Sequence, residues 1–111
     1  MCRYTYKNTG LTIMDQKQVI NIVRRYKNAV AAKYADAKVY LYGSYSKGTA
    51  RPDSDIDVAV VIPECKADWL DTSATLWDIS TTINSLIEPV LLEKKHPTPL
   101  YDDVMRTGIA I

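Results

Sequence analysis

The stretch that most constrains the fold runs from residue 43 to residue 61, GSYSKGTARPDSDIDVAVV. It links two apolar runs by a loop rich in Gly, Ser and Thr. The first run, residues 38–42, is short, β-branched and aromatic, and the second, residues 55–62, alternates in polarity, so both are predicted to be strands. The second run opens with Asp55 and Asp57. This arrangement indicates chemistry on phosphate groups and a divalent metal.

The loop supplies the groups that a phosphate needs. Gly43 ends the first strand, and glycine permits both a positive φ and a close approach of backbone to ligand. The N–H groups of the turn and of a following helix start suit phosphate oxygens, and the Ser44 hydroxyl adds a donor. Lys47 and Arg51 add positive charge. The predicted nucleotide-binding residues are therefore Gly43, Ser44, Lys47 and Arg51, in a loop that lacks the G-K-[ST] of a Walker A motif.

The two aspartates are predicted to hold the metal. Side chains at i and i+2 of a strand point the same way, about 6–7 Å apart, so Asp55 and Asp57 would repel each other. Arg51 is the only obvious cation nearby. Magnesium is typically held by one or two carboxylates together with substrate phosphates and water, and it would relieve this repulsion. Ile56, between the two, is expected to anchor the strand in the core.

Glu88 is the candidate third carboxylate. It begins a predicted strand over residues 88–93, in which Pro89 favours an edge position because it lacks an N–H. Two-metal phosphoryl transfer uses a further carboxylate, and pairing of neighbouring strands would place Glu88 beside Asp57. The alternative is that Glu88 is a surface residue at a strand end. Glu93, on the opposite parity, is a weaker candidate.

The remaining pattern predicts an α+β domain in the order α-β-α-β-α-β-α. A helix capped by Asp15 ends near residue 35, a short helix covers 44–50, and a second long helix covers about 67–86. Its proposed apolar stripe includes Trp69, Leu70 and Trp77, with the tryptophans either in the core or facing a partner. A last short helix spans 101–106, before an apolar tail at 109–111.

Composition excludes several classes of protein. The 111 residues suit one domain, and the net charge of +1 argues against a nucleic-acid partner. Cys2 and Cys65 form neither a disulfide framework nor a zinc motif, so free thiols in a reducing cytoplasm are expected. The sequence shows neither a membrane span nor a signal peptide. Residues 1–13 are an unstructured arm, a segment before a true start at Met14, or an arm that docks on a partner.

Gly43-Ser44, ten further residues and then Asp55-Ile56-Asp57 resemble the signature of the nucleotidyltransferase superfamily with the DNA polymerase β-like fold. The stretch 43–57 is similar to the minimal nucleotidyltransferases, and the likeness extends over about residues 15–111. The resemblance implies a domain over 14–111 with a small mixed sheet and helices mainly on one face. It also implies Mg²⁺ on Asp55 and Asp57, Glu88 in the place of the third carboxylate, and transfer of NMP from ATP or another NTP to an acceptor hydroxyl.

The resemblance also implies a partner. Small members of the family are often encoded beside a HEPN-type helical protein, and some act as antitoxins that adenylylate a tyrosine of that ribonuclease toxin. A partner is expected to supply the acceptor, because 111 residues leave little room for an acceptor-binding domain. The alternatives are a non-catalytic module that neutralises a partner through the Trp69 and Trp77 helix or the arm, and an aminoglycoside nucleotidyltransferase. The acceptor, the preferred base and homo-oligomer formation remain open.

Overall fold

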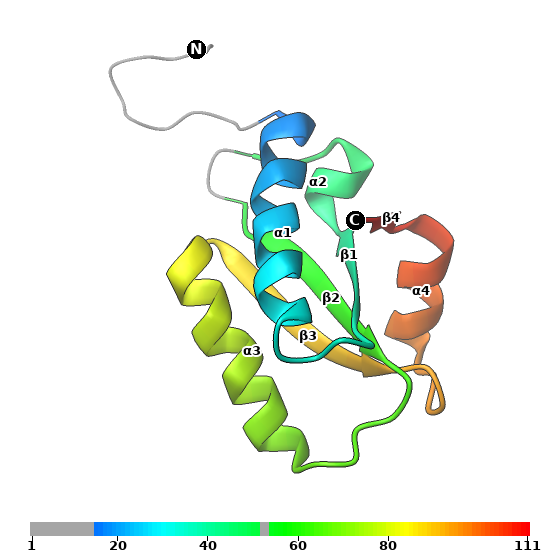
Figure 1. Ribbon diagram of the computed structural model, residues 1–111. Coiled ribbons are helices and arrows are strands. Elements are labelled where there is room, and N and C mark those ends of the chain that lie inside the picture. The colour runs from blue at the N-terminus through cyan, green and yellow to red at the C-terminus, as the bar shows by residue number, and fades with distance from the viewer. Residues whose placement is uncertain (1–14, 52–53) are drawn as a thin grey trace.

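The computed structural model describes residues 15–51 and 54–111, so residues 1–13, Met14 and the predicted turn residue Pro52 lie outside it (Figure 1). The elements are, in order, α1 (Gln16–Ala31), β1 (Lys38–Tyr42), α2 (Ser44–Lys47), β2 (Ile56–Ile62), α3 (Trp69–Ile83), β3 (Ile87–Glu93), α4 (Pro99–Thr107) and β4 (Ile109–Ala110). In this part of the chain, no helix has the length and apolar content that crossing a membrane requires.

The four strands form one mixed sheet in the order β3-β2-β1-β4. β1 pairs antiparallel with β2 and β4, whereas β2 and β3 are parallel. α1 and α3 cover one face, and α4 lies on the other (Figure 1). The predicted α+β class, with a small mixed sheet and helices mainly on one face, is confirmed. β3 is an edge strand, as Pro89 predicted.

Alternation along β2 divides the core between the two faces. Ile56, Val58 and Val60 are fully buried with the apolar side of α1. Ala59 and Val61 point the other way and pack with Val104 of α4, so we call that side the α4 face. The two helices of the first face are also joined by a hydrogen bond, since the Tyr26 hydroxyl of α1 donates to the Leu76 carbonyl of α3 at 3.0 Å. The predicted parity of β2 is therefore correct.

Several predicted helix boundaries are wrong, because the local structure at the helix ends sets where each helix starts and stops. α1 ends at Ala31 rather than near 35, where the N–H groups of Lys33 and Tyr34 turn back to the Val30 carbonyl. α2 is a single turn that stops at Gly48, whose φ is +75°. α4 starts at Pro99 instead of 101, because proline is favoured in the first helical turn. Residues 109–110, which were expected to belong to an apolar tail, instead form β4 and pair with β1.

The predicted apolar stripe of α3 is wrong at Trp69, Leu70 and Trp77, although it also included Leu76, which is buried. The buried side of the helix consists of Thr72, Leu76 and Ser80, while Trp69 and Trp77 are 42% and 45% exposed. The small hydroxyl residues tolerate burial because each bonds to the helix backbone; Thr72 donates to the Asp68 carbonyl at 3.0 Å. The tryptophans are therefore not core residues, and the interpretation that they face a partner remains.

Candidate active site

Three neighbouring strands carry a row of polar side chains at one end of the sheet. In the strand register, Tyr42 of β1 pairs with Asp57 of β2, and Asp57 pairs with Glu88 of β3. All three lie on the α4 face, because their strand neighbours Leu41, Ile56 and Ile87 point into the opposite core. Glu88 thus lies directly beside Asp57, where strand pairing was expected to place it. We call Tyr42, Asp57 and Glu88 the polar row.

Asp55 joins the row from outside the strand. It was predicted to share the strand face with Asp57, but β2 begins only at Ile56, whose N–H donates to the Leu86 carbonyl at 2.8 Å. Asp55 is therefore an exposed loop residue. Asp55 still acts on the row, since it raises the pKa of Glu88, chiefly through a side-chain hydrogen bond and then also through its charge.

Negative charge accumulates around the row and shifts every group in it. Burial, followed by the charge of Asp55, raises the pKa of Asp57 above its usual range. The pKa of Tyr42 rises to about 12, chiefly through burial and then through the charges of Asp57 and Glu88. Each shift disfavours the anionic form, as expected for like charges held close together. A bound cation would favour the anionic forms and so lower these pKa values again.

The donor chemistry of the site suits magnesium. Within residues 15–51 and 54–111, no three His, Cys, Asp or Glu side chains form a ready-made metal cage. Mg²⁺ does not need one, because it keeps several waters and takes one or two carboxylates together with phosphate oxygens. Asp55 and Asp57 supply such carboxylates. That Glu88 is a third ligand of the metal stays a prediction.

Gly43 fixes the loop against Asp57. Its φ of +75° and ψ of −149° belong to a region that is essentially restricted to glycine. A Cβ at this position would meet the Asp57 carboxylate, with Cγ 3.1 Å and Cβ 3.2 Å away. Only glycine therefore lets backbone and carboxylate lie this close. α2 begins at the next residue, Ser44, and the first N–H groups of a helix have no acceptor within it.

The two predicted cations lie on the same segment. Lys47 is the last residue of α2, and Arg51 precedes β2, with its N–H donating to the Ser54 hydroxyl at 2.7 Å. Both side chains are exposed, and neither forms an ion pair with any residue that the structure describes. The structure thus brings the loop and the aspartates together, while Lys47 and Arg51 remain free to turn toward a ligand.

A family model described as "Nucleotidyltransferase domain" matches residues 23–104. The chain belongs to this nucleotidyltransferase family. Two proteins of Methanocaldococcus jannaschii, both named as candidate protein adenylyltransferases, are similar to it. One is 26% identical over 85% of this chain and 99% of its own length. The other is 31% identical over 88% of this chain and 74% of its own length.

Solved structures confirm that the fold is that of nucleotidyltransferases. A nucleotidyltransferase structure from Sulfolobus solfataricus superposes with a TM-score of 0.63 at 19% identity, over 86% of this chain and 80% of that one. A toxin–antitoxin structure with AMP-PNP superposes with a TM-score of 0.54 at 22% identity, over 87% and 72% of the two chains. At these identities, the likeness concerns the fold.

Tyr42 is a residue of the polar row that the sequence prediction missed. Its ring is half-buried and packs with the cluster around Ala59 and Val61. Burial, followed by the charges of Asp57 and Glu88, raises the pKa of its hydroxyl. The signal was present in the alternation of the first strand, where Val39 and Leu41 are the core residues. That parity leaves Tyr42 on the other face, next to Gly43.

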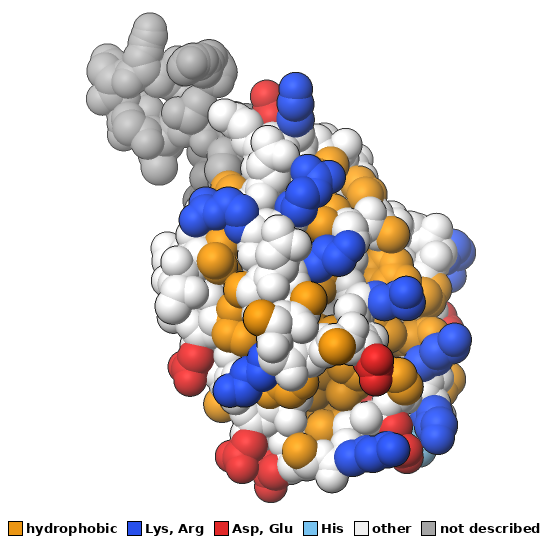
Figure 2. Space-filling view, viewed as in Figure 1, with side chains coloured by type: hydrophobic (Ala, Val, Ile, Leu, Met, Phe, Trp, Pro, Cys, Tyr) orange, Lys and Arg blue, Asp and Glu red, His pale blue; other side chains and the backbone are white. Residues whose placement is uncertain are grey.

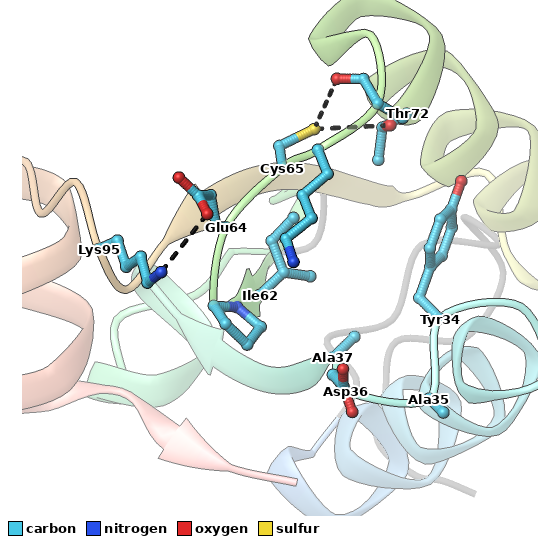
Figure 3. A pocket seen from close by; sticks show the side chains of 12 residues that line it. Tyr34, Ala35, Asp36, Ala37, Ile62, Glu64, Cys65, Thr72 and Lys95 are labelled. Carbon is cyan, nitrogen blue, oxygen red and sulfur yellow. Dashed lines mark hydrogen bonds and ion pairs between the residues drawn. The ribbon is translucent and has the colours of Figure 1, made fainter.

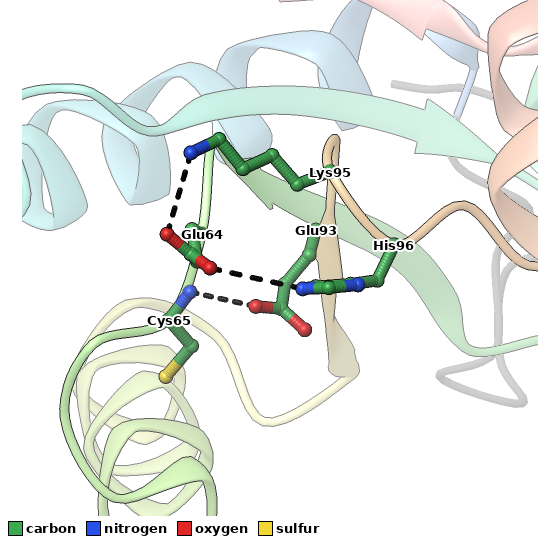
Figure 4. A network of polar contacts seen from close by, with 5 residues as sticks. All are labelled: Glu64, Cys65, Glu93, Lys95 and His96. Carbon is green, nitrogen blue, oxygen red and sulfur yellow. Dashed lines mark hydrogen bonds and ion pairs between the residues drawn. The ribbon is translucent and has the colours of Figure 1, made fainter.

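Glu93, the weaker candidate, lies at the opposite end of this nucleotidyltransferase's sheet and has a structural partner. Its carboxylate accepts from the Cys65 N–H at 2.7 Å (Figure 4). In the same network, Glu64 pairs with Lys95 at 3.5 Å and with His96 at 3.8 Å. Glu93 is thus removed from the polar row, and its carboxylate is used to hold the loop after β2.

A hollow of about 390 Å³ also lies at this opposite end (Figure 3). Its lining includes Tyr34, Ile62, Cys65, Thr72 and Lys95, and none of the predicted site residues. Cys65 is a free cysteine, as predicted, and its thiol lies 3.4 Å from the Ala67 carbonyl and 3.7 Å from the Thr72 hydroxyl. Cys2 lies outside the described residues. The hollow is therefore separate from the polar row.

Proposed function

We propose that this chain is a magnesium-dependent nucleotidyltransferase that moves AMP from ATP onto a hydroxyl of a partner protein. The observation that carries the proposal is the position of Asp57, which lies against the Gly43 backbone on one side and beside Glu88 on the other. The turn proposed to bind phosphate, the carboxylate proposed to bind the metal and the proposed base would thereby meet at one sheet end.

The loop residues would bind the triphosphate. The backbone at Gly43 and the hydroxyl of Ser44 would donate to phosphate oxygens, and Lys47 and Arg51 would offset their charge. Asp55 and Asp57 would hold Mg²⁺, which as a Lewis acid polarises the phosphoryl oxygens. The raised pKa of Asp57 supports this assignment, since a group that is costly to ionise alone gains most from a bound cation.

Glu88 would accept the proton of the acceptor. The acceptor oxygen attacks the α-phosphorus and forms a new P–O bond, while the bond from that phosphorus to the bridging oxygen breaks and pyrophosphate leaves. The hydroxyl proton passes to the Glu88 carboxylate. A raised pKa suits this role, because a general base works best when its pKa lies near the working pH.

The acceptor would be a tyrosine of a HEPN-type helical protein, with this chain acting as its antitoxin in the cytoplasm. Two findings support a protein acceptor: the M. jannaschii relatives are named for protein adenylylation, and a toxin–antitoxin structure shares the fold. The exposed tryptophans of α3 are consistent with a protein partner. They also favour the second candidate function, a module that neutralises its partner by binding alone.

The experiment that separates these functions uses α-labelled ATP. The purified chain is incubated with Mg²⁺ and a HEPN-type helical protein, and label on that protein is measured. We expect labelling that requires Mg²⁺ and falls at least about a hundredfold in Glu88→Gln. Tight binding of the partner without label would favour the binding module and would contradict the transferase proposal.

A further inference from the structure

We propose that the outer side of α3 is the docking surface for the acceptor protein, and that it takes an amphipathic helix with an apolar stripe flanked by Lys or Arg. The proposal rests on the proposed transfer to a protein and adds the partner's binding chemistry. Its two observations are an apolar stripe on α3 that no described element covers and an acidic edge along that stripe.

The stripe follows helical spacing. Leu70, Ala74 and Trp77 stand at i, i+4 and i+7 of α3, so they line one side of the helix. Leu70 is 75% exposed and Trp77 is 45% exposed. Trp69, at the first position of the helix, adds a second exposed indole beside the stripe. Two tryptophans and a leucine on one helix form an unusual surface, because Trp is enriched among the residues that dominate binding energy at interfaces.

An acidic edge accompanies the stripe. Asp71 and Asp78 stand seven residues apart, so they run parallel to the stripe, about a quarter turn around the helix from Leu70 and Trp77. Residues 67–93 contain no Lys, Arg or His at all. The neighbouring α1 has the opposite character, with exposed Lys17, Arg24 and Arg25 and no acidic residue. The acidic edge therefore has no cation of its own helix to pair with.

The two overall views show how charge and the helices are arranged. Several basic side chains run down the middle of the view, while acidic side chains mark the lower left edge, with a basic side chain between them (Figure 2). In the ribbon view, α3 flanks the sheet beside the edge strand β3, and the outer side of α3 faces away from the other labelled elements (Figure 1). A basic partner would thus approach α3 from outside and be repelled by α1.

The same observations disfavour a second copy of this chain as the occupant. The exposed side of α1 would supply the basic residues, but the large exposed hydrophobic residues of the described chain are Trp69, Leu70, Trp77 and Met105, none of which is on α1. Pairing α3 with its own copy would bring the acidic edges into one interface. A foreign helix that carries both apolar and basic residues satisfies both features of the surface.

The polar row lies on the opposite face of the sheet from α3, so an acceptor docked on α3 would reach it around the edge strand β3. α3 is about 22 Å long, and its C-terminal end leads through residues 84–86 directly into β3 and Glu88. Since β3 is an edge strand, no further strand separates the outer side of α3 from Glu88. A helix lying along α3 could therefore present a hydroxyl around this edge.

The test uses two designed helical peptides, read by Trp fluorescence. Both carry Leu at i, i+4, i+7 and i+11, and one has Lys along the flank where the other has Glu. We expect the Lys peptide to bind and shift the emission, and the Glu peptide to bind at least about tenfold more weakly. Leu70→Ala with Trp77→Ala should weaken the Lys peptide by about thirtyfold, read by a label on the peptide. Asp71→Asn with Asp78→Asn should weaken it several-fold and flatten its salt dependence.

Controls keep this result separate from the transfer site. Met105→Ala removes an exposed hydrophobic residue from α4 and should leave peptide binding unchanged. All variants should bind an ATP analogue with Mg²⁺ as the wild type does, which shows that they are folded and that loss of docking is not loss of the nucleotide site. Equal binding of both peptides, or binding indifferent to Leu70 and Trp77, would overturn the proposal. So would a concentration-dependent dimer that Leu70→Ala abolishes, since a second copy would then occupy the stripe.

Discussion

The two ends of the sheet treat their acidic residues in opposite ways. At the end that carries the polar row, Asp57 and Glu88 lie side by side, and in the described residues neither forms an ion pair. At the other end, Glu93 accepts from the Cys65 N–H at 2.7 Å, and Glu64 pairs with Lys95 and His96 (Figure 4). One chain thus contains carboxylates paired with a cation or a backbone N–H and carboxylates crowded by like charge, on the same strand in the case of β3.

The difference distinguishes carboxylates with a structural role from carboxylates that are candidates for a chemical role. A carboxylate that accepts from a backbone N–H, such as Glu93, contributes to folding. Carboxylates crowded together raise one another's pKa and reduce stability, so they require another reason to be there. We propose that in this chain that reason is a bound metal and nucleotide. The following variants test whether the two ends differ in this way.

The largest effect is expected from Asp57→Asn. The change removes a proposed metal ligand, and a metal's electrostatic contribution of several kcal/mol corresponds to a loss of transfer of about a thousandfold. Without Mg²⁺, the variant should unfold at the same temperature as the wild type or higher, because a repelling charge is gone. Label transfer and thermal unfolding measure the two effects. A variant that keeps wild-type transfer would show that Asp57 holds no catalytic metal.

Two glycines with the same positive φ provide the next comparison. At Gly43 an added methyl group would meet the Asp57 carboxylate, whereas at Gly48 nothing lies within 4 Å. Gly43→Ala should therefore cost about 1–3 kcal/mol in the free energy of unfolding and most of the transfer activity. Gly48→Ala should cost about 1–2 kcal/mol from its backbone alone and leave transfer intact. Equal activities of the two variants would show that contact with Asp57 is unimportant.

The pH dependence of the free energy of unfolding should distinguish the two ends of the sheet by a smaller effect. Because the folded-state pKa of Asp57 lies above its ordinary value of 3.8, protonation favours the folded state. Its stabilising contribution is complete below that ordinary value and is lost as pH rises through the raised folded pKa. Denaturant titrations without Mg²⁺ should show this decrease in the wild type and less of it in Asp57→Asn. Identical slopes in both proteins would remove the electrostatic basis of the site.

The smallest effect on activity is expected from Glu93→Gln. The amide oxygen still accepts from the Cys65 N–H, but the bond loses its charge, so the free energy of unfolding should fall by about 1 kcal/mol. Transfer should stay at the wild-type rate, since Glu93 lies at the far end of β3 from Glu88. A large loss of transfer with unchanged stability would reverse the assignment of the two ends.

The sequence predicted the positions of the candidate site residues better than it predicted the helix surfaces. Spacing along the chain was enough to place Gly43 and Asp57 together, because a turn between two paired strands admits few arrangements. Asp55 was misplaced by one residue, since the start of β2 depends on a backbone hydrogen bond to Leu86 that only the tertiary structure provides. The position of Glu88 needed the parallel pairing of β2 and β3, which pattern alone does not specify.

The face of α3 could not be predicted, because hydrophobicity was the wrong guide to it. Thr72 and Ser80 are buried through hydrogen bonds to their own helix, which makes them compatible with a close helix contact. Trp77 was assigned to the stripe by its helical spacing and is 45% exposed. A hydrophobic residue that the fold leaves outside is informative for this reason, since the docking proposal depends on it.

The most direct test of the account is a calorimetric titration of a non-hydrolysable ATP analogue in the presence of Mg²⁺. The wild type and Glu93→Gln should bind the analogue with equal affinity, and both should lose binding when Mg²⁺ is chelated. Asp57→Asn should bind at least about tenfold more weakly, as expected when one charged contact to the metal is removed. If Asp57→Asn binds as the wild type does while Glu93→Gln does not, the nucleotide site lies at the other end of the sheet and the account is contradicted.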